Sequence, residues 1–228
     1  MVTSREEHLT RLESQIAATQ ERLSFLSHRE FHGERPKALL HCLQEAVELG
    51  KGCVVMGRVP LPLPMFVVAR VLVETLILAA WVARSEENAH AYMEAGAQGL
   101  AKFALININQ GRLVAQSRST GGDATADVQK LLESVEVERF KVEKIAAEVG
   151  LTKVYDIAYR FFSLHVHGKT YGLPSGKKLE EGAAFALAAV VSLLQSILLI
   201  TENRLLHDRE TSGADIEKVL RVSGRAGA

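Results

Sequence analysis

The stretch Tyr155 to His167 (YDIAYRFFSLHVH) holds the residues whose types and spacing are best suited to chemistry. Steps of four, three and four residues separate Asp156, Arg160, Ser163 and His167. An α-helix turns once every 3.6 residues, so this spacing predicts that the four polar side chains lie on one stripe. In a helix that is largely buried, such groups need partners.

Positive charge gathers around the same helix. Within residues 157–179 the basic residues are Arg160, Lys169, Lys177 and Lys178, and there is no Asp or Glu. A cationic cluster beside a histidine predicts an anion or phosphate site. For Lys177 and Lys178 we favour a solvated loop instead.

The same helix carries a second stripe, which we expect to be core. Its members are Tyr155, Tyr159, Phe162 and Val166. His165 lies two residues from His167 and points elsewhere, so this helix cannot offer both imidazoles to one metal ion. Glycine-rich phosphate loops, GxSxG elbows and HExxH motifs are missing from the sequence. We therefore predict neither a metal site nor a cofactor.

A second polar pair occurs in the apolar stretch 65–84, where Arg70 and Glu74 are four residues apart. Buried charges of this kind are paired or functional. One interpretation is an intrahelical ion pair that fixes the register between helices. The other is that both side chains enter the same pocket as Arg160 and His167.

These residues need helices to position them, and helical periodicity covers almost the whole chain. It predicts an all-α antiparallel helical bundle with an extra N-terminal amphipathic helix. The expected helices are 4–27, 38–49 (stopped by Gly50), 65–84, 86–115 (capped by Ser85), 127–149, 152–167 (capped by Thr152) and 179–206. The prolines of PLPLP (60–64) predict an extended loop.

Three segments follow from this pattern: an N-terminal helix and linker (1–35), the bundle domain (36–206) and a polar C-terminal tail (207–228). The first helix has a coiled-coil-like seam, which we expect to pack on its own copy, to cover the bundle or to recruit a protein partner. The seam residues are Leu9, Leu12, Ile16, Leu23 and Leu26.

Composition bounds the class of protein. Of the 228 residues 47% are hydrophobic, which excludes a disordered chain, and 27 basic residues balance 27 acidic ones. Any nucleic-acid binding must therefore rest on a local patch. Two cysteines outside a CxxC motif and a charged N-terminus predict a reduced cytoplasmic protein. The apolar stretches 65–83 and 182–200 are long enough to span a membrane, but we favour soluble core helices.

Four residues lie between Arg160 and His165, and six lie between Arg160 and His167. This spacing resembles the Arg-x4–6-His pattern of HEPN proteins (higher eukaryote and prokaryote nucleotide-binding domains). The resemblance implies a helical bundle that often forms a homodimer. In catalytic members the Arg–His site lies at the dimer seam and cleaves RNA without a metal ion.

A second resemblance joins the two polar clusters. Arg70-x-x-x-Glu74 in one helix, followed by Tyr159-x-x-x-Ser163-x-x-x-His167 in a later one, is similar to the bacterial domain of unknown function numbered 5677. This likeness covers roughly residues 36–206.

The resemblance assigns a role to each residue. Arg160 would stabilise charge on the scissile phosphate, and His167 would transfer the proton as general acid or base. We choose His167 over His165 because seven residues, nearly two turns, return it to the face of Arg160. Ser163 would orient the phosphate or the imidazole. Further residues assigned to the site are Arg70, Glu74, Asp156, Tyr159 and His165 in support, and Lys169 at the phosphate.

Two functions remain open. The first is a metal-independent HEPN-type endoribonuclease, a toxin or antiviral (phage-defence) effector. The second is a non-catalytic helical binding or assembly protein, in which the Arg, Glu, Ser and His cluster is a buried structural network.

Overall fold

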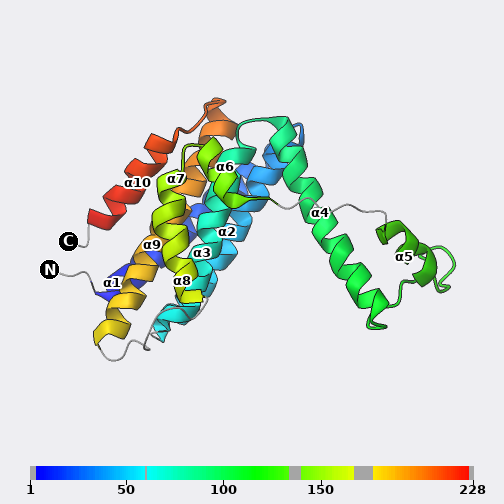
Figure 1. Cartoon of the computed structure of the whole chain (residues 1–228). Helices are drawn as coiled ribbons and strands as arrows, with labels where there is room; N and C mark the ends of the chain where they lie inside the picture. Colours follow the sequence, from blue (N-terminus) through cyan, green and yellow to red (C-terminus); the bar gives the residue numbers. More distant parts are fainter. Residues whose placement is uncertain (1–3, 60, 134–139, 167–176, 226–228) are drawn as a thin grey trace. The chain divides into compact units, whose positions relative to one another are not determined.

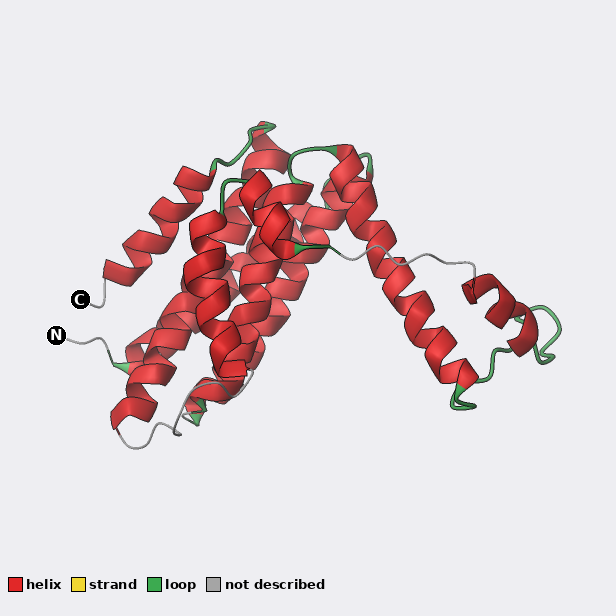
Figure 2. Cartoon of the chain, in the orientation of Figure 1, coloured by secondary structure: helices red, strands yellow, loops and turns green. Residues whose placement is uncertain are grey.

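The computed structural model describes residues 4–59, 61–133, 140–166 and 177–225. Every regular element in these ranges is a helix, apart from one isolated antiparallel bridge between Gln116 and Asp123 (Figures 1 and 2). The predicted all-α class is therefore confirmed. Backbone contacts divide the chain into two units, which are Met1–Ala89 with Lys141–Ala228, and His90–Phe140.

The first unit is a bundle built around two apolar helices, α3 and α9, which pack against each other. Helix α2 packs on both of them, α1 packs on α2 and α9, the segment from α6 to α8 packs on α3, and α10 packs on α9 (Figure 1). The helices of this unit are α1 (Arg5–Ser27), α2 (Glu34–Arg58), α3 (Pro62–Val82), α6 (Val142–Glu148), α7 (Thr152–Val154), the π-helical turn η1 (Tyr155–Tyr159), α8 (Arg160–Val166), α9 (Lys177–His207) and α10 (Gly213–Arg225).

Helix α1 covers the bundle, which is one of the arrangements expected for its seam. Its buried side chains include Leu9, Leu12, Ile16 and Leu26. Ser4 caps the helix, since its Oγ accepts from the Glu7 backbone N–H while its own N–H donates to the Glu7 carboxylate. A reciprocal pair of this kind satisfies two N–H groups at the helix start.

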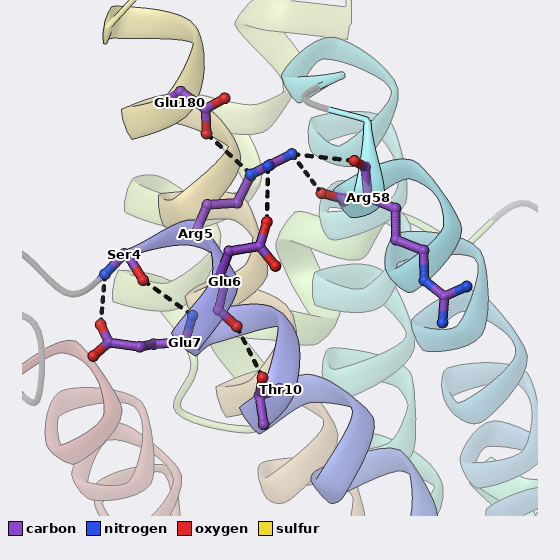
Figure 3. Close-up of polar contacts among 8 residues, drawn as sticks. Ser4, Arg5, Glu6, Glu7, Thr10, Arg58 and Glu180 are labelled. Atoms are coloured by element: carbon purple, nitrogen blue, oxygen red, sulfur yellow. Dashed lines mark hydrogen bonds and ion pairs between the residues drawn. The ribbon is translucent and has the colours of Figure 1, made fainter.

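Arg5 ties the start of α1 to two other helices (Figure 3). One Nη donates to the carbonyls of Gly57 and Arg58 at the end of α2, at 3.0 and 3.3 Å. Its Nε forms an ion pair with Glu180 near the start of α9, at 3.0 Å. A cation at the last carbonyls of α2 also complements the negative end of that helix.

Gly50 does not end α2, contrary to the sequence expectation, because this helix continues to Arg58. A Cβ atom at Gly50 would lie 3.1 Å from a Leu194 methyl and 3.3 Å from Ile16 Cγ1. Glycine is therefore used here for close approach, since it lets α2 reach α1 and α9 together.

Other boundaries also differ from those predicted. Helix α3 begins at Pro62, because a proline in the first turn lacks only an N–H that would be unpaired anyway. The residue before α7 is Leu151, so Thr152 is its first residue rather than its cap. In place of the expected helix 127–149 the structure has two helices, α5 (Thr125–Glu133) and α6. The boundary between the two units, at residues 140 and 141, falls between these helices.

The C-terminal segment is not only a polar tail, since it contains α10. Ser212 and Asp215 cap this helix reciprocally, with two backbone–side-chain hydrogen bonds of 3.2 Å. Ile216 is buried. A Cβ atom at Gly213 would lie 2.5 Å from the Gly150 carbonyl oxygen, so the start of α10 lies directly on the turn after α6.

The second unit contains most of α4 (Glu86–Asn109) and all of α5. Ser85 caps α4 as predicted, since its Oγ accepts from the Asn88 N–H at 3.1 Å. The helix ends at Asn109, before the expected Ala115, and the chain leaves it through Gly111, whose φ of 66° suits glycine.

Helices α3 and α9 (over Glu180–His207) are both long and apolar enough to cross a membrane by length and composition, and most of each apolar window is buried within the chain. Cys42 and Cys53 are buried thiols of α2 and form no disulfide. Eleven residues along one helix separate them by roughly 16 Å, which is too far for a disulfide. Burial raises the pKa of Cys53 to about 12, so this thiol stays protonated at neutral pH.

The glycine contact predicts a difference between two sites on α2. We expect Gly50→Leu to lower the free energy of unfolding by about 1–3 kcal/mol, because overpacking forces the bundle apart. Gly52 has no heavy atom within 4 Å of its Cβ position, so Gly52→Leu is the matched control and should not destabilise the chain. Urea denaturation measures both, and equal losses would contradict the close approach at Gly50.

Candidate functional site

Arg70 of α3 is the centre of a polar cluster that joins this helix to η1 and α8. Its Nε donates to Ser163 Oγ at 3.1 Å, and its Nη2 donates to the Tyr159 hydroxyl at 2.6 Å. The guanidinium carbon also lies 4.9 Å from the centroid of the Tyr159 ring. The structure therefore brings Arg70 of the apolar stretch 65–84 together with two residues of the stretch 155–167.

Aromatic packing sets this geometry. Phe66 lies one helical turn before Arg70, and its ring centroid is 5.8 Å from that of Phe162 and 6.0 Å from that of Phe161. Phe66 and Phe162 are buried, so their contact presses α8 against α3. Ser163, the next residue after Phe162, is thereby held within reach of the guanidinium.

Two tyrosines extend the cluster along η1. The rings of Tyr155 and Tyr159 stack with centroids 4.9 Å apart and 16° between their planes. The Arg160 guanidinium carbon lies 5.5 Å from the Tyr155 ring, so the tyrosine pair stands between two arginines. Burial raises the pKa of Tyr155, and the nearby carboxylate of Glu143 raises it further.

The structure divides the polar stripe that the sequence predicts. Arg160 forms ion pairs with Asp156 at 3.0 Å and with Glu143 of α6 at 3.2 Å, and 58% of its side chain is exposed. Ser163 instead faces Arg70. Asp156 and Arg160 keep their predicted i,i+4 contact, whereas Arg160 and Ser163, three residues apart in α8, face α6 and α3 respectively. Two side chains three residues apart lie about 60° from each other around the helix axis, which is enough for them to meet different neighbouring helices.

The predicted ion pair between Arg70 and Glu74 does not form. Arg70 turns toward the hydroxyls of Tyr159 and Ser163. Among the residues that the structure describes, no carboxylate pairs with the Arg70 guanidinium and no hydrogen bond or ion pair is observed for Glu74. Arg70 is half-buried, so its charge is only partly solvated and has no counter-ion in this part of the chain.

Three predicted site residues fall where the structure gives no side chain. His167 and Lys169 lie outside the described residues. His165 belongs to the backbone of α8, but its side chain also lies outside the described part. Within the described chain, no group of three or more His, Cys, Asp or Glu residues is arranged to hold a metal ion.

The cluster has the chemistry of an anion site. Ser163 and Tyr159 both accept from Arg70, which leaves their hydroxyl protons free to be donated. A half-buried guanidinium and two hydroxyl donors at one place suit the oxygens of a phosphate or carboxylate. An anion there would also offset a charge that is costly to leave unpaired away from water.

A family model described as "Family of unknown function (DUF5677)" matches residues 37–176. The chain belongs to the DUF5677 family. The matched range of this DUF5677 protein holds all three residues of the Arg70 cluster and excludes the whole of α1, α9 and α10. Comparisons with curated proteins and with solved structures found no match.

Helical spacing did not predict two contacts of this site. By spacing Tyr159 belongs to the core stripe, and only the family resemblance placed it in the site as a supporting residue; its hydroxyl is a partner of Arg70. The residue type could have indicated this contact, since a buried tyrosine ring usually places its hydroxyl where it forms a hydrogen bond. No feature of the sequence indicates that Glu143 pairs with Arg160, because this contact depends on how α6 packs beside η1.

The contacts of Arg70 and Arg160 predict which substitutions destabilise the chain most. We expect Ser163→Ala and Tyr159→Phe each to lower the free energy of unfolding by about 1–2 kcal/mol, because each leaves an N–H of Arg70 without its acceptor. Arg160→Ala removes only exposed ion pairs and should cost less than about 1 kcal/mol. Urea denaturation of the three variants measures this order. A loss for Arg160→Ala as large as for Tyr159→Phe would contradict it.

Proposed function

We propose that the Arg70 cluster binds a phosphate group of RNA, and that the protein is a metal-independent endoribonuclease of HEPN type. The observation that carries the proposal is a half-buried guanidinium held by two hydroxyls with no carboxylate partner among the described residues. Arg160, first considered for the phosphate, is less suited because Asp156 and Glu143 already offset its charge.

In this proposal the ribose 2′-hydroxyl attacks the adjacent phosphorus and the 5′-oxygen leaves, giving a 2′,3′-cyclic phosphate. Arg70 stabilises the negative charge that develops on the non-bridging oxygens, and Ser163 and Tyr159 donate to the same oxygens. His167, four residues after Ser163 in the sequence, takes the proton of the 2′-hydroxyl or gives one to the leaving oxygen. His165 is the alternative base, and Lys169 would contact the flanking phosphate.

A HEPN-like bundle that acts as a homodimer in the cytoplasm, as a toxin or antiviral effector, completes the proposal. Two exposed apolar side chains support a second copy at this place. Val67 and Leu164 are each within one helical turn of the cluster, and 41% and 48% of their respective surfaces are exposed. The burial of most of α3 and α9 inside the chain supports a protein that needs no membrane.

The proposal predicts RNA cleavage by the purified full-length chain in the presence of EDTA. Arg70→Met and His167→Ala should each lower the cleavage rate by roughly 10²-fold or more, the usual cost of losing an oxyanion partner or a general acid–base group. Arg160→Ala is the comparison that decides between the two arginines and should keep most of the activity. Circular dichroism confirms that each variant is folded. Cleavage abolished by EDTA, or unchanged by both substitutions, would contradict the proposal.

The second candidate is a non-catalytic binding or assembly protein, in which the cluster is a structural network. The observation that favours it is that both hydrogen bonds of Arg70 run between helices, so they fix the register of α3 against η1 and α8. A protein partner would then meet the exposed, charged face of α1, since most of the seam of that helix is buried. No cleavage by the wild type, together with a loss of stability in Arg70→Met, would favour this candidate.

A further inference from the structure

His8 of α1 is the one buried histidine among those whose side chains the structure describes, and the proposed reaction does not use it. Only 6% of its surface is exposed. It lies one helical turn before Leu12, on the side of α1 that packs against α2 and α9. A titratable ring therefore occupies a place in an apolar contact between helices.

The helices approach closely beside this ring. Leu9, the next residue, touches both neighbours of α1. A Cβ atom at Gly57 of α2 would lie 3.2 Å from a Leu9 methyl and 3.1 Å from a methyl of Leu187 on α9. Packing of this density leaves no room for a water molecule between the three helices at this point.

Neither ring nitrogen of His8 forms a hydrogen bond with a described residue, and its Nδ1 has almost no access to water. A neutral imidazole carries one N–H, whereas the protonated ring carries an N–H on both nitrogens. Protonation therefore puts a donor on Nδ1 where it meets neither an acceptor of the described chain nor water. It also adds a positive charge to an apolar contact, and both changes are costly.

The charges of the neighbouring helices do not compensate such a ring. Burial lowers the pKa of His8, Arg11 lowers it further, and Glu7 raises it. The Glu7 carboxylate accepts from the Ser4 backbone N–H at the start of α1. The nearby charged side chains of α9 and α2 are paired elsewhere, Glu180 with Arg5 and Arg58 with Glu13.

Other charged groups line an apolar hollow beside His8. This hollow, of about 650 Å³, lies between η1 and α8 on one side and α9 and α10 on the other. Its charged lining residues are Lys153 of α7, Glu181 of α9, and Glu217 and Arg221 of α10. Arg221 and Glu217 pair with each other at 2.9 Å, and none of the described carboxylates forms an ion pair with His8.

We propose that His8 makes the docking of α1 sensitive to acid, so that the N-terminal half of this helix leaves α9 when the ring is protonated. Once released, both N–H groups donate to water and the charge is solvated. The release uncovers the buried seam residues Leu9, Leu12 and Ile16. Because the pKa of the docked ring is lowered, the docked arrangement is favoured at neutral pH, and this preference is lost as the pH falls below the ordinary histidine value of about 6.5.

Hydrogen exchange of the full-length protein at pH 7 and pH 5, corrected for the intrinsic exchange rates, measures this release. We expect the opening constant of residues 5–16 to rise several-fold from pH 7 to pH 5. The upper limit is about 25-fold, because the released ring titrates with an ordinary pKa of about 6.5. Amides of α3 should keep the same protection at both pH values. Equal protection of residues 5–16 at pH 7 and pH 5 would overturn the proposal.

Two variants separate His8 from other titrating groups. His8→Phe keeps an aromatic ring that cannot be protonated, so its α1 should be protected equally at both pH values. His32→Gln, at an exposed position, is the matched control and should keep the pH response of the wild type. An NMR titration of the His8 imidazole in the wild type reports its pKa however the variants fold. A His8 pKa at or above about 6.5, or the wild-type loss of protection in His8→Phe, would contradict the proposal.

Discussion

The arrangement of this protein depends on the guanidinium of Arg70, the one basic group on the largely apolar helix α3. Helix α3 buries its apolar side chains against α2, α9 and the segment from α6 to α8, so a charge on it must find partners where it emerges. It finds them in the hydroxyls of Tyr159 and Ser163 rather than in a carboxylate. Neutral acceptors satisfy the hydrogen bonds of the guanidinium but leave its positive charge in place. That residual charge is what makes the cluster a candidate binding site rather than a finished ion pair.

The rest of the bundle holds α3 and α8 in the positions that this contact requires. The rings of Phe66 and Phe162 press the two helices together one turn from Arg70. On the far side, Gly50 and Gly57 let α2 approach α1 and α9 closely, and Arg5 fastens the start of α1 to α2 and α9. Helix α10 lies along α9 and, with η1 and α8, borders an apolar hollow that is open to water. The same π turn and α8 therefore contact the polar Arg70 cluster on one side and this apolar hollow on the other.

Local sequence signals were enough for the all-α class, for the cap at Ser85, and for the end of a helix close to residue 149. They were not enough where packing overrides a local rule. Gly50 reads as a stop but serves a close contact, and Pro62 opens a helix instead of preventing one. In the site, spacing alone placed Arg160 and Ser163 on one stripe, and it could not show that α6 supplies Glu143 to the first while α3 supplies Arg70 to the second. The family resemblance grouped Arg70, Tyr159 and Ser163 with Glu74 and His167. The first three residues meet, Glu74 forms no observed hydrogen bond or ion pair with them, and His167 lies outside the described residues.

The central claim is that Arg70 presents an uncompensated positive charge to a phosphate, and salt-dependent RNA binding tests it most directly. A single-stranded RNA with 2′-O-methyl groups blocks the attack by the 2′-hydroxyl, so binding is measured without cleavage. We predict that Arg70→Met weakens binding and reduces the slope of log K against log salt by about 0.7, the value for one phosphate contact on a single strand. Tyr159→Phe keeps the charge and should keep the slope. Equal slopes for the wild type and Arg70→Met would contradict the account.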